Sequence, residues 1–457
     1  MVRLRRPPEW GVDPVLEPLR MLRTFDLFVL WSSLGVGLLV LAAGTLLVTA
    51  FGLTLSEALL VALAGSVVGS LLLAGAAHHG SRAGVPTMVS LRPILGRGGS
   101  FAPTALNILQ LLGWTAFELL IMAEAAAILT GNVFGPWTAA LFVPIWGAIA
   151  MALALGGPLA VVRQWLERFA IWIVYGSTIA VAIALILRGL DPNLRPAPIA
   201  GAFAGTGSLL LGLDLVVAMP VSWWPLVSDY NRFARTPKAS AVGTALGYTA
   251  ANTAFYVLGA ALVFLGITAF SMNPKDPTAF LATLGLLGLG VLPLLAILVD
   301  ETDNAFADVY SAAVSVQNVA PKARQATTIG VAAGIGMVVA WYLIGTRQGI
   351  GGSYESFLFL IGGLFVPLLG VVIADSFLVR RGTYARAEFF EAAPRWRWPA
   401  FASWIPGVAL YFVIIFFQVP IGATIPSFAL AAGLHVGLSR IEQALGRKSA
   451  AVAGGDS

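Results

Sequence analysis

The sequence predicts an all-α polytopic membrane protein with about twelve transmembrane helices. Three observations support this fold class. Of the 457 residues, 58% are hydrophobic and only 11% are charged, with a mean hydropathy of +0.87. Apolar runs of about 20 residues, long enough to cross the hydrocarbon core of a bilayer, recur along the whole chain. The basic residues follow the positive-inside rule when both termini are placed in the cytoplasm.

The apolar runs define the predicted helices. They lie near residues 25–51, 56–78, 101–130, 134–155, 162–187, 205–228, 240–270, 286–318, 325–345, 354–379, 397–418 and 421–441. Residues 1–24 are basic and lack the apolar core of a signal peptide, so we interpret them as a cytoplasmic lead-in. The tail 446–457 is expected to be disordered.

The distribution of charge supports both the helix count and the orientation. Of the 27 Lys and Arg residues, only Arg188, Arg195, Lys275 and Arg347 fall in loops assigned to the outside. The pI near 9.6 is therefore a topology signal. It does not indicate nucleic-acid binding, since the basic residues form no stripe with interleaved aromatics. We expect a multi-pass protein of the cytoplasmic membrane.

The residue types argue against an enzyme. The chain has no Cys and three His, which excludes disulfides and thiolate metal sites and leaves no metal cluster with ligand spacing. No nucleophile with an accompanying base is found. A repeated channel filter is also missing from the sequence, so a carrier is the favoured class.

The third predicted helix carries a polar stripe. Asn107, Gln110, Trp114 and Glu118 follow one another at offsets of three, four and four, so they share one helix face. A carboxylate inside a membrane faces a protein interior or a wet cavity, and it is a functional-site candidate by default. The alternative is that Glu118 serves a buried donor and Trp114 only packs.

Two predicted helices contain features that interrupt regular structure. The first has Ser32, Ser33, Gly35 and Gly37 within an apolar run. The sixth has Pro220 and Pro225 on either side of Ser222, Trp223 and Trp224. Interrupted helices at matching positions in two halves indicate an inverted-repeat transporter with its site near the midplane. Ordinary packing glycines and proline kinks are the alternative.

The eighth predicted helix is rich in acids. It contains Asp300, Glu301, Thr302, Asp303, Asn304 and Asp308. These side chains cannot face lipid. We interpret Asp303 and Asp308 as site residues, whereas Asp300 and Glu301 belong either to the site or to an aqueous mouth.

Four segments resemble the nucleobase:cation symporters of the purine and cytosine permease type. They are WSSLGVG from residue 31, GVPTMVSLRPILGRGGSFAPTALNILQLLGWTAFE from residue 84, SWWPLVSDYNRFA from residue 222 and TDNAFADVYSAAVS from residue 302. The resemblance covers nearly the whole chain. It implies a LeuT-like fold of ten core helices in two inverted repeats of five, with helices one and six discontinuous and two helices added. The expected boundaries are 25–190 and 191–380 for the repeats and 381–445 for the added helices.

The resemblance also implies roles for residues. The substrate would stack between Trp114 and either Trp223 or Trp224, with Gln110, Glu118 and Asp308 at its edge. In hydantoin-transporting relatives a glutamine commonly occupies the position of Glu118. The cation would lie between the first helix, at Ser33, Leu34 and Gly37, and the eighth, at Thr302 and Asp303.

The carboxylates predict the edge of the substrate. Because a carboxylate only accepts hydrogen bonds, Glu118 and Asp308 favour a ligand with adjacent N–H donors, such as cytosine or a hydroxymethylpyrimidine. A purine, hydantoin or allantoin symporter is the alternative within the family, and an amino-acid carrier of the same architecture is less compatible with the acids. The coupling ion is either Na⁺ or H⁺, with no other cofactor, and we expect a monomer.

Overall fold

The computed structural model describes residues 11–157, 171–194, 209–273, 279–346, 351–390 and 394–453. Within these ranges the regular structure is helical, apart from an isolated bridge between Leu22 and Ala234. The beginning of the predicted fifth helix, residues 162–170, lies outside the described residues. So do residues 1–10 of the predicted cytoplasmic lead-in and residues 454–457 of the predicted tail.

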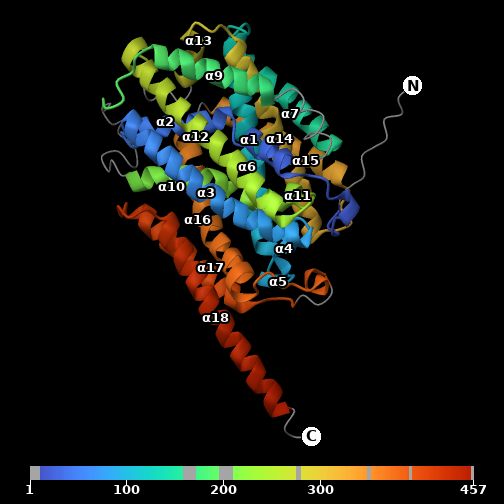
Figure 1. Ribbon diagram of the computed structural model, residues 1–457. Helices are drawn as coiled ribbons and strands as arrows, with labels where there is room; N and C mark the ends of the chain where they lie inside the picture. The colour runs from blue at the N-terminus through green and yellow to red at the C-terminus, as the bar shows by residue number, and fades with distance from the viewer. Residues whose placement is uncertain are drawn as a thin grey trace, which may run out of the picture.

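The helices of the first half lie close to the predicted spans. They are η1 (Glu17–Leu19), α1 (Thr24–Ser33), α2 (Leu38–Thr49), α3 (Leu55–Ala83), α4 (Thr87–Ser90), α5 (Arg92–Leu95), α6 (Phe101–Leu129), η2 (Gly135–Trp137), α7 (Thr138–Gly156) and α9 (Ile171–Leu187). Figure 1 shows them closely packed, with α9 lying across one end of the molecule.

The second half contains the remaining helices. They are α10 (Leu209–Ser222), η4 (Trp224–Leu226), α11 (Val227–Asn231), α12 (Pro237–Phe270), α13 (Ala279–Leu286), α14 (Leu292–Val319), α15 (Gln325–Gly345), α16 (Gly351–Ile373), the π-helical turn η5 (Ala374–Val379), η6 (Arg386–Phe389), α17 (Trp398–Phe416) and α18 (Thr424–Ala453). Among the described residues, eight helices are long and apolar enough to cross a membrane, or nine with α1 and α2 taken together. The count of twelve and the repeat boundaries stay predictions.

The first span is broken, as its small residues predict. α1 ends at Ser33, α2 begins at Leu38, and the two helices meet at 62°. The intervening residues keep only short-range hydrogen bonds, such as that from Val36 N–H to the Ser33 carbonyl. The break therefore leaves the N-terminus of α2 and several carbonyl oxygens inside the protein.

The sixth span is interrupted by the 3₁₀ turn η4. Trp223 and Leu226 donate their backbone N–H groups three residues back, to Pro220 and Trp223. Pro225 has no N–H. The Ser222 carbonyl therefore loses the donors that an α-helix would provide, and side chains must supply them.

Glycines allow α2 and α12 to approach closely. A Cβ at Gly44 would lie 2.3 Å from the Tyr256 carbonyl oxygen, and one at Gly259 would lie 2.1 Å from that of Leu41. Small residues at such crossings are the usual means of close helix packing in membranes. The contact holds the second half of the broken first span against a straight helix.

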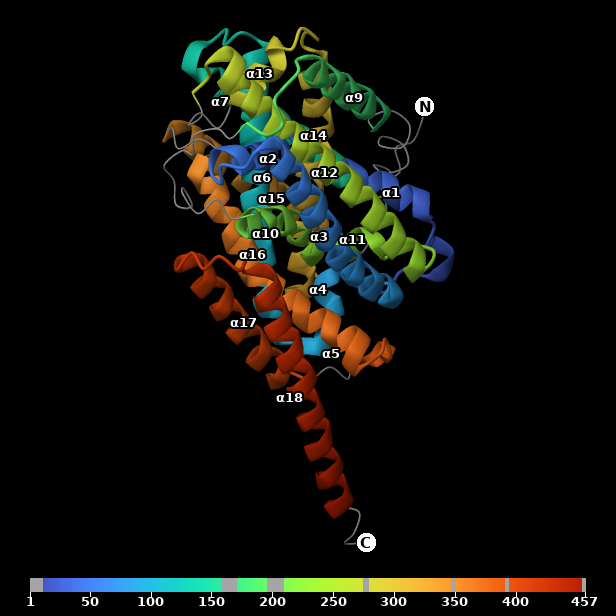
Figure 2. The same ribbon diagram turned by 60° about the vertical axis from the view of Figure 1, so that its left-hand side comes forward.

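α17 and α18 pack beside α16 on one side of the protein, and α18 runs beyond the other helices in both views (Figures 1 and 2). The carboxylate of Asp214 in α10 accepts hydrogen bonds from the N–H groups of Ala423 and Thr424, and so caps the N-terminus of α18. α18 continues to Ala453, into the segment predicted to be disordered from residue 446. Its alanines there favour helix.

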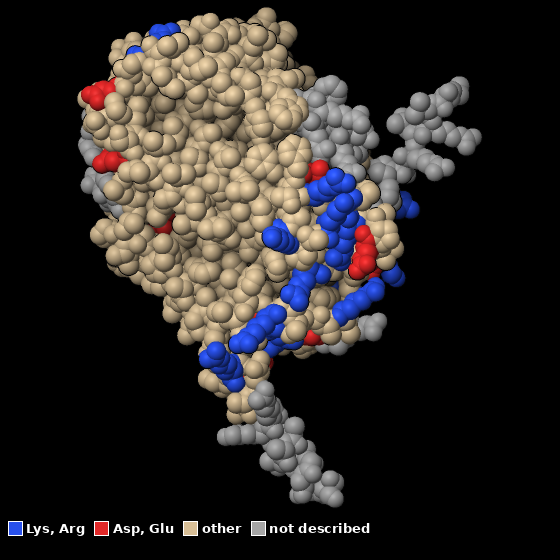
Figure 3. Space-filling model, viewed as in Figure 1, with Lys and Arg blue, Asp and Glu red and all other residues tan. Residues whose placement is uncertain are grey.

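Lys and Arg gather in a band across one end of the molecule, whereas most of the remaining face is uncharged (Figure 3). The band crosses the region where Figure 1 places α11, α4 and α5. This separation agrees with the alternation of charge along the sequence.

Gly259→Ala is expected to lower the stability of the protein by about 1–3 kcal/mol, because the added methyl group collides with the α2 backbone. Gly330→Ala in α15 is the control, since its Cβ would meet no atom within 4 Å. Thermal unfolding in detergent compares the two variants with the wild type. Equal unfolding midpoints for the two variants would contradict the close crossing of α2 and α12.

Candidate functional site

The polar stripe of α6 and the acids of α14 meet beside the broken first span. Glu118 and the acids of α14 are at most 3% exposed; the acids are Asp300, Glu301, Asp303 and Asp308. Asp300 and Glu301 are completely buried, so the alternative that they lie at an aqueous mouth is wrong. The buried acids predicted from the sequence form one cluster within the helical domain.

Glu301 closes the N-terminus of α2. Its carboxylate accepts hydrogen bonds from the backbone N–H groups of Leu38 and, at 3.4 Å, Leu39. The positive end of the helix dipole stabilises an anion at this position. The carboxyl group of Glu118 in α6 lies beside that of Glu301. Two buried carboxyl groups side by side repel each other when both are charged, so this pair is a place where a proton can be held.

The start of α2 faces a group of hard oxygen atoms. The Ser33 hydroxyl donates to Asp300 at 3.0 Å, and the Asn304 amide donates to the Val36 carbonyl at 2.9 Å. The two carboxylate oxygens of Asp303 are buried and have no hydrogen-bond partner of good geometry, although the Ser33 hydroxyl and the Asn304 backbone N–H lie near them. Oxygen atoms without donors are what a small cation requires.

The other predicted cation residues occupy different positions around this group. The Thr302 hydroxyl donates to the Val299 carbonyl of its own helix, at 2.7 Å. A Cβ on Gly37 would lie 2.8 Å from Glu301, so Gly37 makes room for the carboxylate that caps α2. Leu34 follows the last turn of α1, and its N–H bonds back to Leu30. Of the predicted cation residues, Ser33 is hydrogen-bonded to Asp300 of α14, and Asp303 lies near the same hydroxyl.

Two side-chain amides of α6 donate hydrogen bonds to carbonyl groups at the interruption of the sixth span. Gln110 donates to the Ser222 carbonyl at 3.1 Å and to Asn107 at 2.8 Å, while Asn107 donates to the Pro225 carbonyl at 3.3 Å. Both N–H groups of the Gln110 amide are therefore occupied, and its carbonyl oxygen has no donor. These bonds place the polar stripe directly beside the residue that precedes Trp223.

The three candidate tryptophans have different surroundings. Trp114 lies edge-on against Tyr354 and Phe357 of α16, with ring centroids 6.0 and 5.2 Å away. Trp223 lies edge-on against Trp31 of α1 at 6.2 Å. Trp114 and Trp223 are 6% and 8% exposed.

Trp224 points elsewhere and is completely buried. Its indole N–H donates to the Phe365 carbonyl in α16 at 3.1 Å. Trp224 therefore anchors the break to α16. Of the two adjacent tryptophans, Trp223 is the one with an edge left uncovered.

Sequence reasoning missed two aromatic residues at the site. Trp31 holds α1 to α11 by donating to the Asn231 side chain at 2.8 Å, and it opens the first of the four family segments. Tyr354 contacts Trp114 and donates its hydroxyl to the Leu39 carbonyl at 3.0 Å. Nothing in the apolar run around Tyr354 distinguishes it from a packing residue.

Three acceptor oxygens of the predicted substrate-edge residues lack donors. They are Oε2 of Glu118, Oε1 of Gln110 and Oδ2 of Asp308. Each buried polar atom without a partner costs about 1–3 kcal/mol. An arrangement of flat aromatic rings and unsatisfied acceptors is suited to a planar ligand with several N–H groups.

Comparison with known proteins decides the family. The sequence model described as "Permease for cytosine/purines, uracil, thiamine, allantoin" matches residues 14–435. The chain belongs to this permease family. It is therefore a membrane transporter and not an enzyme, as the sequence predicted.

The curated relatives include the allantoin permease of Bacillus subtilis, 23% identical over 76% of this chain and 74% of that protein. Another is the hydantoin permease of Microbacterium maritypicum, 22% identical over 86% of this chain and 82% of that protein. Among solved structures, Mhp1 of the nucleobase-cation-symport-1 family, closed with bromovinylhydantoin bound, aligns over 95% of both chains. The TM-score is 0.76 at 19% identity, and this likeness confirms the LeuT-like class of fold.

Glu301→Gln is expected to destabilise the protein by about 1–2 kcal/mol, because it removes the charge at the N-terminus of α2. Glu57→Gln is the matched control. Glu57 belongs to the capping box at the start of α3 and is partly exposed, so its loss should cost about 0.5 kcal/mol. Unfolding midpoints measured in detergent test the difference. A larger loss in the control would contradict the role given to Glu301.

Proposed function

We propose that this permease imports a planar, nucleobase-like heterocycle with an N–H-rich edge, by symport with a cation and alternating access. The observation that carries the proposal is the set of buried acceptor oxygens on Glu118, Gln110 and Asp308 beside Trp114 and Trp223. A ligand that supplies N–H donors there would pair with these oxygens and so remove the free-energy cost of leaving them unsatisfied. The proposal rests on the protein's own residues and agrees with its family.

Stacking would contribute to the binding affinity but would not distinguish one planar heterocycle from another. Every planar heterocycle presents a π-face, and a stacked base contributes about 1–3 kcal/mol in base-binding proteins. Trp114 and Trp223 would hold the ring from opposite sides. Trp224, bound to the α16 backbone, would support the turn that carries Trp223.

The edge would select an aminopyrimidine. Cytosine and hydroxymethylpyrimidine, when protonated on a ring nitrogen, offer two adjacent N–H donors that a carboxylate can accept side by side. Uracil and hydantoin mix donors with acceptors along the same edge. A site of buried acceptors discriminates against ligands that leave those acceptors unpaired.

Allantoin or hydantoin is the second candidate, because relatives matched over most of this chain carry those names. Glu118 is the residue that separates the candidates. A protonated Glu118 would present a neutral carbonyl oxygen as an acceptor, as a glutamine would. In that state the edge would accept a hydantoin ring. A purine remains a further alternative within the family.

The cation would bind between α1 and α14. Ser33, Asp303 and the carbonyl of Leu34 would be ligands, with Thr302 and Gly37 close by, and either Na⁺ or H⁺ would be the coupling ion. Binding there would bring charge to unsatisfied carboxylate oxygens. We also propose a monomer in the cytoplasmic membrane with the basic band facing the cytoplasm, since one chain supplies the whole cluster.

Uptake into proteoliposomes tests the substrate and the ion together. Labelled cytosine, hydroxymethylpyrimidine, allantoin and hydantoin are compared under an imposed Na⁺ gradient and under an imposed proton gradient. Accumulation of an aminopyrimidine is expected, and the gradient that drives it identifies the ion. Preference for hydantoin or allantoin over every aminopyrimidine would favour the second candidate, and gradient-independent uptake would contradict symport.

Glu118→Gln is expected to lower aminopyrimidine uptake at limiting substrate by about 10- to 100-fold, because it replaces a charge-assisted acceptor by an amide. Glu124→Gln on the same helix is the control, since six residues of α6 rotate Glu124 away from the polar stripe. Equal losses in both variants would show that Glu118 has no specific role at the edge.

A further inference from the structure

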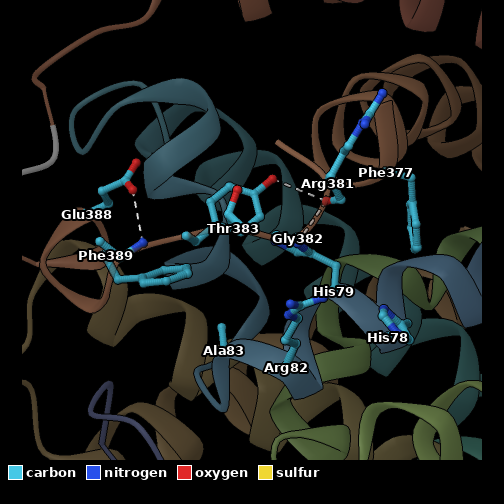
Figure 4. Close-up of a pocket in the computed structure, with 13 residues that line it drawn as sticks. His78, His79, Arg82, Ala83, Phe377, Arg381, Gly382, Thr383, Glu388 and Phe389 are labelled. Carbon is cyan, nitrogen blue, oxygen red and sulfur yellow. Dashed lines mark hydrogen bonds between the residues drawn. The ribbon is translucent and has the colours of Figure 1, made fainter. Parts of the chain in front are cut away.

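A cavity of about 880 Å³ lies away from the central site, between the end of α3 and the loop that follows η5. Figure 4 shows Arg82, His79 and His78 of α3 below this loop, with Arg381 extending from its rim. Nothing in the transport cycle proposed above uses this cavity. Its lining nevertheless contains exposed arginines, and an exposed apolar face of α3 leads to it.

The charge of the lining is positive. Arg82 and Arg381 are exposed, and neither has a carboxylate within 4.0 Å among the described residues. Glu388 also lines the cavity, but Arg380 neutralises it at 2.7 Å. Two arginines therefore remain without a counter-charge at one cavity, which favours an anion.

The back wall is held in place by buried hydrogen bonds. His79 bonds to the Ser376 hydroxyl at 2.8 Å and to the Ser90 carbonyl at 3.3 Å. The Tyr384 hydroxyl donates to Asp375 at 2.6 Å. Because these bonds join α3, α4, η5 and the following loop, the cavity does not depend on the conformation of the arginines.

Gly382 allows Arg82 to lie against the loop. Its φ of +75° is in the left-handed region, which glycine adopts without strain. A Cβ there would lie 2.3 Å from an Arg82 guanidinium nitrogen. The loop and the arginine thus pack together at the opening of the cavity.

An apolar track leads along α3 to the cavity. Leu60 and Leu71 are 66% and 60% exposed, and the helical spacing carries their face on to His78 and Arg82. Phe377 and Leu378 of η5 are also exposed. Both belong to a helix that is long and apolar enough to cross a membrane, so their side chains are suited to contact lipid. The cavity therefore lies where a lipid-facing surface gives way to a basic one.

We propose that this cavity binds the phosphate head group of an anionic phospholipid, with an acyl chain along the exposed face of α3 near Leu71. The phosphate would pair with Arg82 and Arg381, and arginine suits phosphate because its planar N–H groups form two parallel bonds. Basic pockets between helices at a membrane surface have this chemistry. A soluble phosphate would use the arginines but would leave the apolar track without a partner.

The test uses the full-length protein in nanodiscs of phosphatidylcholine alone or mixed with phosphatidylglycerol. For the wild type, phosphatidylglycerol is expected to raise the unfolding midpoint and to stay bound in native mass spectrometry. The double substitution Arg82→Ala with Arg381→Ala is expected to weaken phosphatidylglycerol binding roughly thirty-fold and to abolish the rise in midpoint. Arg324→Ala, an exposed arginine at the start of α15, is the matched control and should keep both effects.

Three results would overturn the proposal. One is a wild type that does not distinguish the two lipids, and another is a double variant that retains phosphatidylglycerol. The third is an equal stabilisation by inorganic phosphate in phosphatidylcholine nanodiscs, which would assign the cavity to a soluble anion. Arg82→Lys with Arg381→Lys keeps the charge but loses the paired N–H groups, so its binding is expected to lie between that of the wild type and that of the double alanine variant. Unfolding midpoints in phosphatidylcholine alone show whether each variant is folded.

Discussion

The centre of this permease buries more acceptor oxygens than donors, and the helices around it are arranged so as to supply the missing donors. Five of the buried carboxyl groups belong to the central cluster, those of Glu118, Asp300, Glu301, Asp303 and Asp308. An unpaired charge inside a membrane protein is costly, so each acid needs a donor, a proton or a cation. The N-terminus of α2 serves Glu301 and the Ser33 hydroxyl serves Asp300. The N–H groups of Leu38 and Leu39 are free to bind Glu301 only because α2 begins there, so the break provides the donors of this acid.

The same constraint links the two halves of the proposed site. Glu301 accepts hydrogen bonds from the start of α2, and its carboxyl group also lies beside that of Glu118 in α6. Glu118 also has an oxygen left for a ligand. A cation that changes the charge around Asp303 would therefore act on a network that reaches the substrate edge through a few side chains. Each ligand can shift the conformational equilibrium only by its differential affinity for the two states.

The sequence could predict the fold class, the break in the first span and the polar stripe of α6, because these follow from periodicity and small residues within one segment. It could not predict that Glu301 caps α2, since the partners are more than 260 residues apart. Nor could it separate Trp223 from Trp224. The two are neighbours with the same side chain, and only the 3₁₀ geometry of the turn sends one towards α16. Nor could the sequence show that the Thr302 hydroxyl donates to a carbonyl of its own helix, which leaves the lone pairs of its oxygen for a cation.

The cap that Asp214 forms on α18 has a mechanical consequence. Asp214 belongs to the first half of the interrupted sixth span, and its carboxylate holds the first N–H groups of α18. Breaking these bonds would leave a buried carboxylate without donors, because Asp214 is 3% exposed. The sixth span and the last helix are therefore tied together at this point, although α18 packs mainly against α16 and α17. Any movement that separated α10 from the start of α18 would have to supply the Asp214 carboxylate with other donors.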